Sequence, residues 1–177
     1  MKALLLLIAS SLAPAELHQY EQLLATSQFT ELEHQLVQQD DYKQHPDLLV
    51  LYARALIALK RLDDANTLLN FATEKFPQNS ELAYLGGLSK IRLASDGNVF
   101  AAKDRAARGV ALLRKAVSLK PDHYAARQAL IDFYSIAPAV AGGDKELAQQ
   151  MAEQLAKEDP AQALLAQSRI LLNEKKP

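Results

Sequence analysis

The 177-residue sequence contains no cysteine, which excludes disulfide scaffolds, thiol catalysis, thiolate metal sites and lipid anchors attached to cysteine. Histidine is scarce as well. The four residues, at positions 18, 34, 45 and 123, lie at least eleven positions apart, so they lack the spacing of a local metal site. The formal net charge is only −1, and the chain as a whole therefore has no strong electrostatic attraction for nucleic acid.

Catalytic motifs are missing too. The sequence has no glycine-rich phosphate loop, no HExxH motif and no nucleophile elbow. Gly86 and Gly87 lie within a helical pattern, where small residues favour close packing of helices over the approach of a ligand. We therefore expect a protein that is not an enzyme and that needs no cofactor and no metal ion.

Good helix formers make up most of the chain beyond residue 15: alanine, leucine, glutamine, glutamate and lysine. No segment alternates apolar and polar residues as a half-buried strand would. Pro77, Pro121 and Pro160 each follow a helical segment, at spacings of 44 and 39 residues. Because proline ends a helix, this recurrence predicts an all-α chain built from helical repeats.

The clearest unit is Pro46–Asn79, which is 34 residues long. Its apolar positions share helical spacing on two predicted helices: Leu49, Tyr52, Ala53 and Leu56 on the first, and Ala65, Leu69 and Ala72 on the second. This unit resembles the tetratricopeptide repeat (TPR), which has about 34 residues and whose pattern ends on a proline. Leu49 stands where that repeat usually has tryptophan, and Ala53 where it has glycine.

Two more units, residues 80–123 and 124–160, resemble the repeat less closely. The prolines that end them lie 44 and 39 residues after the proline of the preceding unit, which is ten and five residues more than the repeat length, and the excess predicts inserted loops at 94–103 and 137–144. Residues 16–39 are predicted to be a diverged helical pair, and 161–177 a capping helix. The resemblance implies a right-handed α–α superhelix, a solenoid of three to four helical hairpins plus that C-terminal helix. A helical bundle is the alternative, which prolines in register disfavour.

The N-terminus has the order of features found in a secretory signal. Lys2 precedes an apolar run, Ala3–Leu12, which is shorter than the about 20 residues that a membrane-spanning helix needs. Ala13–Ala15 then forms an A-x-A cleavage site. These features predict a cleavable signal peptide at 1–15 and a periplasmic or secreted protein, which suggests a Gram-negative bacterium. The alternative is a cytosolic scaffold whose residues 2–12 form a buried first helix.

Charge is distributed unevenly along the chain. Residues 16–89 carry a formal net charge of −6, whereas residues 90–127 carry +6. The basic segment could form a surface that steers an acidic partner, or it could be an ordinary solvated helix face.

The resemblance to the TPR implies a concave groove that is lined by the first helix of each unit and binds a peptide or a partner protein. In this register, the candidate partner-binding residues are Arg54, Tyr84, Leu88, Arg92, Gln128 and Asp132. The family's lysine and asparagine clamp for carboxylate tails is not present, because Val50, Arg54, Leu85, Ala125 and Ala129 occupy its positions. We expect a non-catalytic interaction or assembly module. The alternative is an accessory helical domain with a small-molecule site formed by the loops 94–103 and 137–144.

Overall fold

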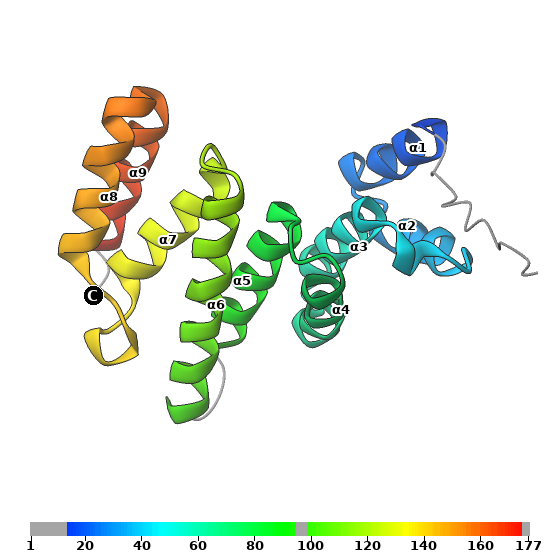
Figure 1. Cartoon of the computed structure of the whole chain (residues 1–177), viewed down its shortest axis with the longest axis horizontal. Helices are drawn as coiled ribbons and strands as arrows, with labels where there is room; N and C mark the ends of the chain where they lie inside the picture. The colour runs from blue at the N-terminus through cyan, green and yellow to red at the C-terminus, as the bar shows by residue number, and fades with distance from the viewer. Residues whose placement is uncertain (1–13, 95–98, 175–177) are drawn as a thin grey trace, which may run out of the picture.

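A computed structural model describes residues 14–94 and 99–174, and within them it contains α-helices, two short 3-10 helices and no strand (Figure 1). The α-helices are α1 (Pro14–Ala25), α2 (Phe29–Val37), α3 (Pro46–Ala58), α4 (Leu62–Lys75), α5 (Ser80–Ala94), α6 (Val99–Leu119), α7 (Tyr124–Ile136), α8 (Lys145–Glu158) and α9 (Pro160–Glu174). The 3-10 helices are η1 (Tyr42–Gln44) and η2 (Ala139–Ala141). The predicted all-α fold is confirmed.

The helices form four successive hairpins, α1/α2, α3/α4, α5/α6 and α7/α8, which follow one another along the long axis of the molecule (Figure 1). The first helix of each hairpin contacts the first helix of the next, so α1, α3, α5, α7 and α9 form one continuous layer. We call its surface the first-helix face. The last helix, α9, contacts both α7 and α8, which is the position of the first helix of a further unit. The predicted solenoid with a final capping helix is therefore confirmed.

Three separate clusters of apolar side chains hold the hairpins together. Most of the core positions predicted for the unit 46–79 are almost completely buried, namely Leu49, Ala53, Leu56, Ala65, Leu69 and Ala72. Leu32 and Leu36 of the first pair are fully buried as well. The prolines act as expected, since Pro77 and Pro121 follow the ends of α4 and α6. Pro160 follows α8 and is itself the first residue of α9.

The first two hairpins turn in the same way, although their sequences differ. Ser27 and Lys60 both adopt a left-handed backbone conformation with φ of 60°. In the second turn the Arg61 N–H donates to the Leu56 carbonyl at 2.9 Å, and the Lys60 N–H donates to the Ile57 carbonyl at 3.1 Å. This pair of hydrogen bonds is the Schellman motif, which usually has glycine at the left-handed position. The shared turn indicates that α1/α2 belongs to the same series of repeats.

The helices α5 and α6 cross with their backbones very close together at Gly87 and Gly109. A methyl group added at Gly87 would lie 2.7 Å from the Gly109 carbonyl oxygen and 2.8 Å from Leu113 Cγ. The neighbouring Gly86 has more room, because its nearest atom would be Leu112 Cδ1 at 3.3 Å. The expectation that this glycine pair serves helix packing is therefore confirmed for Gly87.

The loop predicted at 94–103 is wrong for residues 99–103, because they form the start of α6; residues 95–98 lie outside the described part of the chain. The segment Val99–Ala107 contains four alanines and no glycine or proline, so its local preference is helical. The second inserted loop, predicted at 137–144, does connect α7 and α8. It contains η2, which packs against α6.

Candidate functional site

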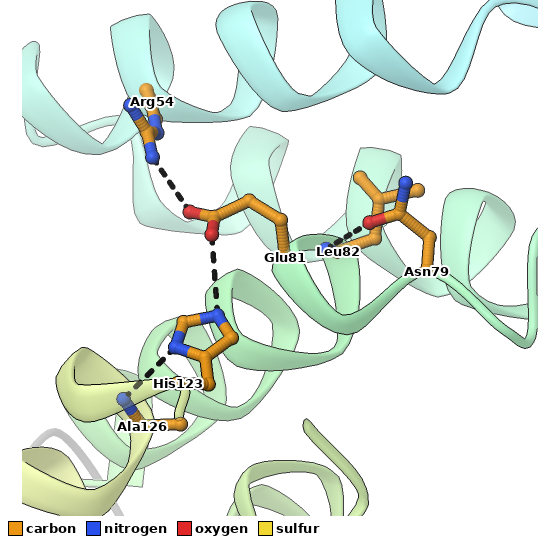
Figure 2. A network of polar contacts seen from close by, with 6 residues as sticks. All are labelled: Arg54, Asn79, Glu81, Leu82, His123 and Ala126. Carbon is orange, nitrogen blue, oxygen red and sulfur yellow. Dashed lines mark hydrogen bonds and ion pairs between the residues drawn. The ribbon is translucent and has the colours of Figure 1, made fainter. Parts of the chain in front are cut away.

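A polar network joins three consecutive units on the first-helix face (Figure 2). Glu81, in the first turn of α5, accepts a hydrogen bond from Arg54 of α3, with Nη2 and Oε1 2.7 Å apart. Its second oxygen lies 3.2 Å from Nε2 of His123, the residue that precedes α7. His123 is buried, and its Nδ1 accepts a hydrogen bond from the Ala126 N–H at 3.3 Å, which caps α7. One carboxylate therefore fixes the relative positions of α3, α5 and α7.

Tyr84 lies on α5 next to this network and is half-buried. Its ring packs on the His123 ring, with centroids 5.0 Å apart and planes tilted by 50°. Burial and the neighbouring Glu81 carboxylate raise the pKa of the Tyr84 phenol, while Arg92, Arg54 and Arg169 act in the opposite direction. The three arginines belong to α3, α5 and α9.

Leu88 and Arg92 continue the stripe that Tyr84 begins, at successive intervals of four residues along α5. Leu88 is half-buried and Arg92 is exposed. Arg54 is paired with Glu81, but Arg92 makes no ion pair within the described part of the chain. The structure thus brings Arg54, Tyr84, Leu88 and Arg92 together on one surface, as the repeat register predicts.

The structure places Gln128 and Asp132 of α7 differently, because α9 lies against them. Gln128 is buried, and its Nε2 donates to the Gln162 carbonyl of α9 at 2.8 Å. The Asp132 carboxylate forms an ion pair with Arg169 of α9. Both side chains therefore contact α9, and the Asp132 side chain stays 20% exposed. This hydrogen bond and this ion pair hold α9 against α7.

Arg169 is the functional candidate that the sequence analysis missed. It lies beyond the last unit that resembles the repeat, in the segment predicted to be the capping helix. The sequence did contain a signal, since Arg169 is the only charged residue between Pro160 and Asn173. A lone charge on an apolar helix usually has a specific partner.

Several basic side chains of the segment 90–127 make contacts between helices. Lys90 donates to Asn66 and Asn70 of α4, and its partial burial and the nearby Arg108 lower its pKa. Arg114 donates to the Tyr134 hydroxyl at 2.7 Å, and Arg127 pairs with Glu158 of α8. Part of the positive charge thus serves contacts between helices.

The connection between α7 and α8 lines a surface depression, formed by residues 136–139 and 143–146. Asp144, one of the residues that line this depression, caps α8, because its Oδ1 accepts a hydrogen bond from the Leu147 N–H at 2.9 Å. Among residues 14–94 and 99–174, no group of three or more histidine, aspartate and glutamate side chains is placed to hold a metal ion. In the same residues, no helix combines the length and the apolar character needed to cross a membrane.

Residues 34–88 match the family model of the tetratricopeptide repeat, from the second half of α2 to the middle of α5. The match includes the whole α3/α4 hairpin. The comparisons with curated proteins and with solved structures returned no significant match. The match and the helical solenoid together indicate a protein-interaction module, since repeats of this kind use an extended face to bind other proteins and are generally non-catalytic.

Proposed function

We propose that the chain binds an acidic segment of a partner protein on the first-helix face, between α3 and α9. The observation that carries this proposal is the presence of three arginines on this face: Arg54, which pairs with Glu81 of α5, Arg92 of α5, and Arg169, which pairs with Asp132 of α7. They come from three different helices of one layer, so their arrangement depends on the fold rather than on a local run of sequence. Extended peptides are common ligands of such helical arrays.

The charge of this surface favours an acidic ligand. Glu81 compensates Arg54, and Asp132 compensates Arg169, whereas the exposed Arg92 has no acidic partner among the described residues. Tyr84 and Leu88 provide apolar surface beside it. Tyrosine and arginine often dominate binding energy, because each combines a broad contact surface with directional hydrogen-bond donors.

The test uses a fluorescently labelled peptide of consecutive glutamates as the probe and measures its affinity for the full chain. Arg92→Glu should weaken binding by about 1–3 kcal/mol, or roughly 5- to 150-fold. Lys103→Glu is the matched control, because Lys103 is exposed on α6 and carries the same charge. It should bind the probe nearly as well as the unmodified chain does. Added salt should weaken binding, because exposed charges are screened.

Two results would contradict the proposal. The first is equal loss of affinity in the two variants, which would reflect net charge rather than a specific face. The second is no binding of the probe by the unmodified chain at low ionic strength. Circular dichroism of each variant provides the control for folding, since exposed substitutions of this kind should leave helicity unchanged.

The proposal also includes export from the cytoplasm, which the sequence of residues 1–15 supports. Cleavage after Ala15 would remove only two described residues, Pro14 and Ala15, and both are exposed. Tyr20, which is buried in the core, and the partly buried Leu17 would remain. Intact-mass measurement of the protein from its native cells should give a chain that starts at Glu16. A chain that retains Met1 would contradict export through a cleaved signal.

A further inference from the structure

The outer side of α9 is an apolar surface that no helix of the described chain covers. Its four leucines are exposed by more than half: Leu164 at 67%, Leu165 at 56%, Leu171 at 57% and Leu172 at 63%. The opposite side of the helix packs on α7 and α8 through Ala163, Ala166 and Ile170, which are buried. In the preceding units, α3, α5 and α7 are each followed by a second helix and a further first helix. A contiguous apolar patch of this kind on a soluble domain commonly marks an interface.

The spacing of the four exposed leucines along α9 is symmetric about Ser168. Leu164 and Leu165 lie four and three residues before Ser168, and Leu171 and Leu172 lie three and four residues after it. In an antiparallel pair of such helices, the leucines before Ser168 on one copy would face the leucines after it on the other. A two-fold axis would then pass beside Ser168, whose small side chain permits close approach of the helices.

The charge of the helix agrees with self-association. From Pro160 to Asn173 the only charged residue is Arg169, and its guanidinium is paired with Asp132 on the side that faces α7. The leucine surface therefore has one neighbouring charge, and Asp132 compensates it in each copy. We propose that the occupant of this surface is a second copy of the chain, bound through α9 in an antiparallel, isologous dimer.

The exposed leucines alone offer less surface than the about 800 Å² per partner of a standard stable interface. We therefore expect a reversible dimer that forms as concentration rises. Arg169 borders this leucine surface, since it lies four residues after Leu165 and three before Leu172, but the dimer depends on the leucines and not on the proposed peptide-binding face.

Sedimentation equilibrium of the full chain tests the proposal. The apparent mass should rise with concentration from the chain mass of 19.5 kDa toward twice that value. The double variant Leu164→Glu with Leu171→Glu should weaken association by about tenfold or more, because carboxylates would have to lose their water in the interface. Val140→Glu is the control, since Val140 is exposed at 73% but lies in η2. A chain that stays monomeric, or a double variant that still dimerises like the control, would overturn the proposal.

Crosslinking tests the antiparallel arrangement directly, because the chain has no cysteine of its own. Ser168→Cys should form a disulfide-linked dimer on mild oxidation, since the two positions would face each other at the axis. Ala161→Cys, also exposed on α9, should not, because it would lie far from its counterpart in an antiparallel pair. Efficient crosslinking of both variants, as a parallel pair would give, would overturn the proposal, and so would crosslinking of neither.

Discussion

Replacing Gly87 by alanine should destabilise the α5/α6 hairpin, because the added methyl group has no room. It would lie 2.7 Å from the Gly109 carbonyl oxygen, a backbone atom that cannot move without shifting α6. Overpacking of this kind costs about 1–3 kcal/mol, and a clash with backbone favours the upper part of that range. Alanine also gains about 1 kcal/mol of helix propensity over glycine, so the expected net loss is about 2 kcal/mol.

Gly86→Ala is the matched control, one residue earlier in the same helix. Its methyl group would meet Leu112 Cδ1 at 3.3 Å and Thr73 Cγ2 at 3.4 Å, both of them ends of side chains that can adjust. The propensity gain should then make this variant between about 0 and 1 kcal/mol more stable. Urea denaturation followed by circular dichroism measures both values. If Gly87→Ala is as stable as Gly86→Ala, the close crossing of α5 and α6 is refuted.

Three other perturbations follow from the contacts described. Lys60→Gly should stabilise the chain by up to about 1 kcal/mol in thermal denaturation, because glycine removes the cost of the left-handed conformation, whereas glycine at Leu59, with φ of −73°, should destabilise it. Glu81→Ala should lower the free energy of unfolding by about 1–3 kcal/mol, since it leaves the buried His123 without its partner; the exposed Glu74→Ala should change it little. Burial and the hydrogen bond to Glu33 raise the pKa of Tyr52 above its ordinary value of 10.0. The unfolded phenol therefore ionises first as the pH rises above 10, so stability should fall there, and Tyr52→Phe should reduce this fall in urea denaturation at alkaline pH.

Most of the fold could be predicted from the sequence, because helical periodicity and proline position are local properties. The apolar spacing in Pro46–Asn79 correctly placed Leu49, Ala53 and Leu69 in the core. The sequence did not predict the start of α6 at Val99, because the loop at 94–103 was inferred from the excess over a standard repeat length. A length difference shows that residues are extra, but local helix preference decides whether they form a loop.

The candidate site could be predicted only in part, because it depends on contacts between helices far apart in the sequence. The register placed Arg54, Tyr84 and Arg92 on one face, since it fixes which side of each first helix points away from the core. It could not show that α9 packs against Gln128, or that Arg169 pairs with Asp132. Those contacts follow from the angle at which the last helix docks, which no local pattern encodes.

The central claim is that an acidic ligand binds on the first-helix face, and mapping of backbone amide chemical shifts by NMR tests it most directly. On titration with the glutamate peptide, the largest shifts should occur along α5 from Tyr84 to Arg92 and around Arg54 and Arg169. The exposed side of α6 and the connection at 137–144 should change little. Shifts concentrated on α6 or on that connection, with the α5 stripe unaffected, would contradict the account.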